Sequence, residues 1–316
     1  MKYFLSLAIL LFLAVNAIGG ENPFAAWPPA FWAALPAAVP CWLLGLFFYA
    51  RRLGLLLGPE HTVSSGRLLK TVWLCNGLNC LLPGHLAEFV KPYYLLTKNG
   101  CPPSLTLSAV VGERGTDLFI LLLAAWPLAA VGWELQWPAL AAPVALLWLA
   151  LLTLPRIAKY LSPLLARVIP WGGWRQVALN IVDHLAAQVR SGRIWGGLVY
   201  GLLAWLCAWA AVFVFFRLAV GPTFTGTMAL GFLAATMLAY LIPGLPGGLG
   251  AYEAAGVLIL NHYGWAYDQG LLLTAGFHLA QMALAVVGAL VIMVVEKWDW
   301  RQLKNQLQNF RQENRL

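Results

Sequence analysis

The chain alternates long apolar runs with short polar loops, and two of the runs are interrupted by proline and glycine. An apolar run of about 20 residues can cross ~30 Å of hydrocarbon as a helix. The pattern therefore predicts an all-α polytopic membrane protein, in a single transmembrane domain over residues 1–316. Its full spans, about six in number, are expected at residues 3–18, 31–50, 104–131, 138–154, 194–217 and 270–295.

The two interrupted runs cover about residues 67–98 and 226–263 and repeat one order of residues. Each contains Leu-Pro-Gly, then a leucine and a glutamate that opens the next helical run. Backbone that leaves a helix at membrane depth must be covered by protein or water. Paired interruptions in corresponding halves of transporters indicate a binding site near the midplane. The segments are Leu82-Pro83-Gly84 followed by Glu88, and Leu245-Pro246-Gly247 followed by Glu253.

Lysine and arginine counts predict the orientation. Of the 20 such residues, 17 lie at Lys2, at Lys98, in the 51–70 and 155–193 loops and in the tail from Lys297. The loops 19–30, 132–138, 218–225 and 261–269 contain none. The positive-inside rule then places both termini in the cytoplasm.

With this orientation, helix, broken hairpin and helix occur twice, in inverted sense. The first repeat covers about residues 31–131, with a re-entrant hairpin entered from the cytoplasm. The second covers about 194–295, and its segment is either re-entrant or two tilted full spans. Inverted repeats are typical of secondary transporters, although helical hairpins at membrane depth also occur in enzymes and assembly factors.

Three regions lie outside the repeats. Residues 1–17 fit a retained first helix, which we favour, and also a cleavable signal peptide. The connector 155–193 is basic and tryptophan-containing, so we expect interfacial helices on the anionic leaflet. The tail 297–316 fits either another interfacial helix or a solvated basic face.

Composition excludes several classes of protein. Apolar residues make up 61% of the chain and charged residues 10%, whereas soluble domains have about 25% charged residues. The net charge of +8 comes mostly from short loops, which argues against nucleic-acid binding. The five cysteines lack metal-ligand spacing and catalytic motifs are missing, so we expect no metal, no cofactor and no enzyme activity.

Charged residues within spans are expensive and are therefore functional candidates. Glu113 and Asp117 are four residues apart on one helical face, and Arg114 lies about 100° round the helix. One interpretation is a buried ion-pair cluster that fixes this helix to the hairpin. The other is that Arg114 binds an anionic group while a carboxylate orients it or relays protons.

The broken segments supply the remaining candidates. A helix that begins at Gly84 would point free N–H groups at an anion, with His85, Glu88 and Lys91 nearby; Glu88 could instead cap those N–H groups. A titration of His85 near neutral pH would suit a proton-coupled step. In the second half we single out Gly247, Gly248, Tyr252 and Glu253. His278 and Gln281 either line the cavity or, as we favour, form an interhelical hydrogen bond.

These residues resemble the transmembrane-region family of lysylphosphatidylglycerol synthase, the flippase-like domain proteins. The likeness rests on Leu82-Pro83-Gly84 with Glu88, on Glu113-Arg114 with Asp117, and on Pro246-Gly247-Gly248-Leu249-Gly250 with Glu253. Family members often have arginine where this chain has His85, Lys91 and Tyr252, which weakens a bidentate phosphate clamp. The resemblance implies a protein of the bacterial cytoplasmic membrane that moves a lipid or lipid-linked molecule between leaflets.

The sequence therefore favours a lipid flippase whose substrate is a polar or anionic membrane lipid, such as a phospholipid or a polyprenyl-phosphate-linked or hopanoid-type lipid. One alternative is a non-transporting partner that presents lipid to a biosynthetic enzyme. Another is an intramembrane lipid-modifying enzyme.

Overall fold

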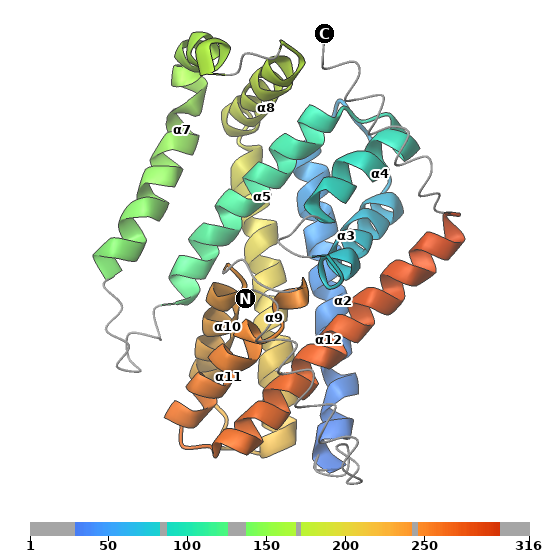
Figure 1. Cartoon of the computed structure of the whole chain (residues 1–316), viewed down its shortest axis with the longest axis vertical. Helices are drawn as coiled ribbons and strands as arrows, with labels where there is room; N and C mark the ends of the chain where they lie inside the picture. Colours follow the sequence, from blue (N-terminus) through green and yellow to red (C-terminus); the bar gives the residue numbers. More distant parts are fainter. Residues whose placement is uncertain (1–28, 83–86, 126–136, 169–171, 242–245, 298–316) are drawn as a thin grey trace.

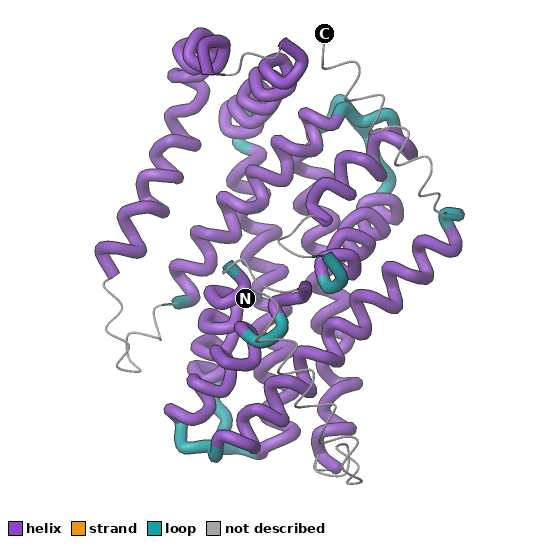
Figure 2. Tube along the Cα trace, viewed as in Figure 1, coloured by secondary structure: helices purple, strands orange, loops and turns teal. Residues whose placement is uncertain are grey.

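The structure is a computed structural model that describes residues 29–82, 87–125, 137–168, 172–241 and 246–297. Throughout these residues the regular secondary structure is helical (Figures 1 and 2). The elements are α2 (Pro29–Leu57), α3 (Ser65–Asn79), α4 (Val90–Asn99), α5 (Pro103–Ala124), α7 (Trp137–Val168), α8 (Gly172–Arg190), α9 (Arg193–Val220), α10 (Gly226–Tyr240), the 3-10 helix η2 (Pro246–Gly248), α11 (Ala251–His262) and α12 (Tyr267–Val295).

Helices α2 and α9 run antiparallel through the middle of the molecule (Figure 1). Small residues let their backbones approach: a Cβ on Gly45 would lie 3.5 Å from Cys207 Cβ, and one on Gly197 would lie 3.1 Å from a methyl group of Leu56. Glycine at helix crossings in membranes allows this kind of close packing. The pair forms the scaffold on which the remaining helices lie.

Three described helices, α2, α9 and α12, are long and apolar enough to cross a membrane. They coincide with the predicted spans 31–50, 194–217 and 270–295. The predicted span 104–131 corresponds to α5, which ends at Ala124, and the predicted span 3–18 lies outside the described residues. The protein is thus a helical membrane protein with transmembrane helices.

The predicted span 138–154 lies within α7, which continues through Pro155 to Val168. Proline is tolerated within a membrane helix when neighbouring groups satisfy the freed carbonyl. Leu151 and Leu154 pack beside Pro155 against Leu185 and Ala186 of α8. Part of the predicted connector 155–193 therefore belongs to α7, and α8 supplies the rest.

Both interrupted runs contain a break between helices. In the first, α3 ends at Asn79, residues 87–89 form a 3-10 turn and α4 begins at Val90. The predicted helical start at Gly84 lies outside the described residues. Pro92 is compatible with the start of α4 at Val90, because proline has no N–H and is tolerated in the first turn of a helix but not in its interior.

In the second broken segment, α10 ends at Tyr240 and α11 begins at Ala251. Between them, Gly247 has φ 66° and Gly250 has φ 88°. These left-handed conformations favour glycine and allow the chain to reverse direction in a short distance.

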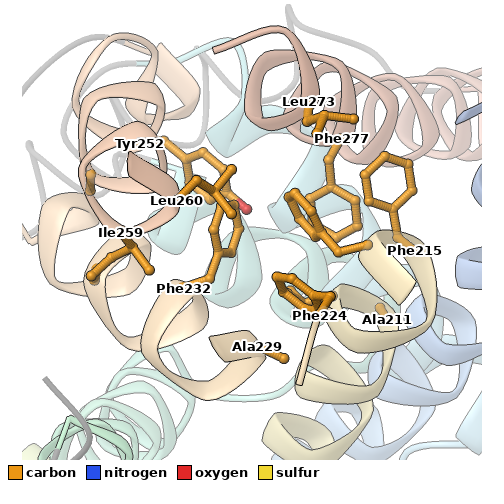
Figure 3. Close-up of a cluster of buried hydrophobic side chains, with 14 of the residues drawn as sticks. Ala211, Phe215, Phe224, Ala229, Phe232, Tyr252, Ile259, Leu260, Leu273 and Phe277 are labelled. Atoms are coloured by element: carbon orange, nitrogen blue, oxygen red, sulfur yellow. The ribbon is translucent and has the colours of Figure 1, made fainter. Parts of the chain in front are cut away.

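Each broken hairpin packs on a helix of the other half of the chain. Helix α3 lies along α12, where Trp73 Nε1 donates a 3.4 Å hydrogen bond to the Leu284 carbonyl. Helix α10 in turn contacts α5. Between α9 and the second hairpin lies an aromatic core that includes Phe215, Phe224, Phe232, Tyr252 and Phe277 (Figure 3).

Candidate functional site

Six charged side chains from α2, α5, the first turn of α4 and the 3-10 turn before it form a closed ring in which cations and anions alternate. Three are cations and three are anions, so the ring carries no net charge when all are ionised. The contacts, in order, are Arg52 Nη1 to Asp117 Oδ1 at 2.6 Å, Asp117 Oδ2 to Arg114 Nη1 at 3.5 Å, Arg114 Nη2 to Glu88 Oε1 at 2.6 Å, Glu88 Oε2 to Lys91 Nζ at 2.9 Å, Lys91 Nζ to Glu113 Oε2 at 2.7 Å, and Glu113 Oε1 to Arg52 Nε at 3.7 Å.

Arg52 is the most extensively bonded cation of the ring, with contacts to Asp117 and Glu113, and sequence reasoning missed it. We assigned it to a 51–70 cytoplasmic loop, but α2 continues to Leu57 and the Arg52 side chain is 2% exposed. Its second nitrogen, Nη2, also donates to Asp117 Oδ2 at 3.2 Å, which gives a bidentate pair. The available signal was the periodicity of α2: Arg52 shares a buried stripe with Leu53, Leu56 and Leu57.

Aromatic and small residues complete the surroundings of Arg52. The Tyr49 ring centroid lies 4.8 Å from the guanidinium carbon, a cation–π distance. Trp205 Nε1 of α9 donates to Asp117 Oδ1 at 3.2 Å. Gly201, one turn before Trp205 on α9, leaves room for the Arg52 side chain, since a Cβ there would lie 3.0 Å from Arg52 Nη1. Helices α2, α5 and α9 thus jointly position this ion pair.

Exposure differs sharply around the ring. The side chains of Lys91 and Glu113 are 5% and 1% exposed, whereas Arg114 is 50% exposed. Buried ionic groups are costly unless each has a partner, and the closed ring gives each charge two opposite neighbours. Arg114 is the cation of the ring that an external anion can reach.

A second polar cluster lies in the other broken segment. Glu253 Oε2 accepts a 2.6 Å hydrogen bond from Gly250 N–H and so caps the start of α11. Its other oxygen lies 2.6 Å from Nδ1 of His278 on α12. Tyr252 stacks on the His278 ring at a centroid distance of 3.9 Å. The predicted interhelical hydrogen bond of His278 is confirmed.

Both glutamates that the sequence aligned make polar contacts. Glu253 caps Gly250 N–H, and Glu88 pairs with Arg114 and Lys91. The N–H groups that Glu88 was predicted to cap lie outside the described residues. Space in front of the two candidate glycines is occupied by side chains: a Cβ on Gly247 would lie 2.5 Å from Met282 Cε, and one on Gly248 would lie 3.1 Å from the Tyr240 ring.

The structure thus brings five predicted residues, Glu88, Lys91, Glu113, Arg114 and Asp117, into one site with Arg52. Gly247, Gly248, Tyr252 and Glu253 lie in the second cluster, and His85 lies outside the described residues. Within the described part of the chain no group of three or more His, Cys, Asp or Glu side chains is arranged to hold a metal ion. The side chains of the two clusters can pair with charged groups and exchange protons.

A third ionic cluster joins the first hairpin to the end of α12. Glu296 contacts three basic residues: Lys70 Nζ at 2.6 Å, Lys98 Nζ at 3.2 Å and Arg67 Nη1 at 3.6 Å. The hydrogen bond from Lys70 is the largest influence on the carboxyl group; with Lys98 it outweighs desolvation and lowers the pKa of Glu296 from 4.5 to about 2.

This cluster predicts a pH dependence of stability. A carboxyl group with a lowered pKa stabilises the folded state above its ordinary pKa, and the contribution is lost as pH falls through its folded pKa. Glu296→Gln should therefore lower the melting temperature by a few degrees near pH 7. The difference from wild type should shrink as pH falls from 4.5 towards about 2.

Thermal melts of purified protein at a series of pH values provide the measurement. Glu60→Gln is the matched control, because Glu60 is 65% exposed and its ion pair with Arg193 is long, at 3.8 Å. Equal melting temperatures for Glu296→Gln and wild type at pH 7 would contradict a stabilising role for the cluster.

Residues 1–289 match the family described as Lysylphosphatidylglycerol synthase TM region. The chain belongs to this family. Membership confirms the resemblance predicted from the broken segments and charged helix, and it indicates a membrane protein related to lipid metabolism or lipid movement. No curated protein and no solved structure matches the chain.

Proposed function

We propose that the protein moves a lipid with a polar or anionic headgroup between the leaflets of the bacterial cytoplasmic membrane. One observation carries the proposal: a neutral ring of six charges, built by α2, α4, α5 and the 3-10 turn before α4, presents a single half-exposed cation, Arg114. The headgroup would bind at Arg114 while the acyl chains stay in the bilayer.

The contacts of Glu88 make an exchange of anions feasible at Arg114. Arg114 now pairs with Glu88, and a guanidinium group matches a phosphate with two parallel hydrogen bonds. If a phosphate displaces Glu88, that carboxylate keeps its 2.9 Å contact with Lys91. Displacement therefore leaves no buried anion without a partner, which keeps its cost low.

The arrangement of the helices supports movement between leaflets. Helices α2 and α9 begin the two proposed repeats and run antiparallel, as an inverted pair requires (Figure 1). Each broken hairpin contacts the last helix of the other repeat, α3 on α12 and α10 on α5. Rocking of one half against the other would expose a site between them to either side.

Leaflet exchange of a fluorescent phosphatidylglycerol in reconstituted vesicles tests the proposal. We expect Arg114→Ala to slow exchange about tenfold or more, since a charge-assisted bidentate contact is lost. The exchange rate of Arg114→Lys should lie between those of wild type and Arg114→Ala, because an ammonium group binds phosphate as a point charge. The matched control is Arg190→Ala, which removes an exposed arginine on α8.

Exchange by wild type no faster than in protein-free vesicles would overturn the proposal. If the same preparation retained a stoichiometric lipid-biosynthetic enzyme, the protein would instead be a partner that presents lipid. Product formation from the labelled lipid by the purified protein alone would point to an enzyme.

A further inference from the structure

The buried pair of Glu253 and His278 has a hydrogen-bond arrangement that specifies its proton content. Both side chains are almost fully buried, at 4% and 1% exposed. His278 Nδ1 lies 2.6 Å from Glu253 Oε1, and His278 Nε2 lies 3.4 Å from the Tyr240 hydroxyl, at the long limit of a hydrogen bond. Tyr240 in turn donates its proton to the Gly247 carbonyl at 2.5 Å.

Counting donors shows which state satisfies all three contacts. Because the Tyr240 proton is directed at Gly247, the hydroxyl oxygen can only accept from His278 Nε2–H. A second proton must then lie between Nδ1 and Oε1, on either atom. The pair therefore holds one proton more than a carboxylate beside a neutral imidazole would.

Loss of that proton breaks one of two contacts. With the remaining proton on Nε2, lone pairs of Nδ1 and Oε1 would face each other at 2.6 Å. With it on Nδ1, the Nε2 lone pair would face the Tyr240 oxygen, unless Tyr240 turned its proton away from Gly247. The charge of the pair also changes from zero to minus one, and a buried net charge in a membrane protein is costly.

Both breakable contacts lead into the second broken segment. Glu253 accepts a hydrogen bond from Gly250 N–H, and Tyr240, which contacts His278, donates one to the Gly247 carbonyl. Both ends of the Gly247–Gly250 turn are therefore linked to the Glu253–His278 pair. The other titratable groups facing the pair are Tyr252, stacked on the imidazole from α11, and Cys80 at the end of α3, which lies near Tyr240. Neither is charged in the neutral pH range.

We infer that Glu253 and His278 bind one exchangeable proton, and that its loss releases the Gly247–Gly250 turn during the transport cycle. The proton is taken up from water on one side of the membrane and returned to water on the other. Lipid exchange would then respond to a pH gradient. This inference rests on the proposed function, because it assigns the ion that drives or gates the same movement.

Exchange measured with and without an imposed pH gradient tests the coupling. For wild type we expect a several-fold difference between the two conditions, and for His278→Gln and Glu253→Gln a ratio near one. His262→Gln is the matched control, because His262 is an exposed histidine in the last turn of α11. Wild-type exchange that ignores the gradient would overturn the coupling while leaving the proposed function intact.

Titration of the histidine ring nitrogens by NMR tests the proton site without any transport measurement. The His278 signals are assigned by their loss in His278→Gln. We expect them to titrate together with the amide signals of Gly247 and Gly250, and Tyr240→Phe to remove the response of Gly247. His278 signals that stay unchanged between pH 5 and 9 would overturn the proton site even if lipid exchange were absent.

Discussion

Arg52→Ala is expected to destabilise the protein by about 3–5 kcal/mol, the usual cost of removing one partner from a buried ionic network. The substitution leaves Asp117 and Glu113 facing each other across the space of the lost guanidinium group, and the ring changes from neutral to a net charge of minus one. Asp117 would retain contacts with Arg114 and Trp205, but Glu113 would keep only Lys91. Thermal denaturation of the purified protein measures the loss.

The neighbouring residue offers a stringent control. Arg51 carries the same charge one position earlier, but it is exposed and its Nη1 contacts only the Ser65 hydroxyl, at 3.2 Å, among the contacts described. Arg51→Ala should change the melting temperature little. A comparable loss for both variants would contradict the central role of Arg52 in the ring.

A double substitution separates charge balance from packing. Arg52→Met keeps much of the side-chain volume but removes the charge, and Asp117→Asn then restores a neutral ring. We expect Arg52→Met/Asp117→Asn to be more stable than Arg52→Met alone, since residues within one ionic network have non-additive effects. A double variant no more stable than the single one would show that the loss comes from packing.

The charges on α5 could be predicted because they are out of place in an apolar run. Helical spacing puts Glu113 and Asp117 on one face, and both indeed contact Arg52. Arg114 contacts Asp117 on its own helix and Glu88 from the first broken segment. What sequence spacing could not provide was the identity of the opposing cation, because a buried arginine at the end of a span looks the same as a loop arginine.

The breaks between helices were also readable from proline and glycine, but not their details. Pro92 lies in the first turn of α4, and this local constraint was hidden behind the more conspicuous Pro83-Gly84. The partners of Glu88 and Glu253 were also beyond the reach of sequence spacing. Arg114 faces Glu88 and His278 faces Glu253 from other helices, and such pairings are tertiary properties.

The second large effect is expected at Gly77, where α3 crosses α12. A Cβ on Gly77 would lie 2.4 Å from both the Ala285 carbonyl oxygen and the Ala289 Cβ. Since a backbone oxygen cannot swing aside as a flexible side chain can, Gly77→Ala must push the helices apart. We expect a loss of about 1–3 kcal/mol from this overpacking, measured as a lower melting temperature, despite the better helix propensity of alanine.

Gly66 gives the matched substitution in the same helix. It is exposed in the first turn of α3, and a Cβ there would meet no atom within 4 Å. Gly66→Ala should therefore leave stability unchanged or raise it by up to about 1 kcal/mol through helix propensity. Helices α3 and α12 come from different halves of the chain, so this contact holds the first hairpin to the second half. A melting temperature of Gly77→Ala equal to or above that of wild type would contradict the close approach of Gly77 to Ala285 and Ala289.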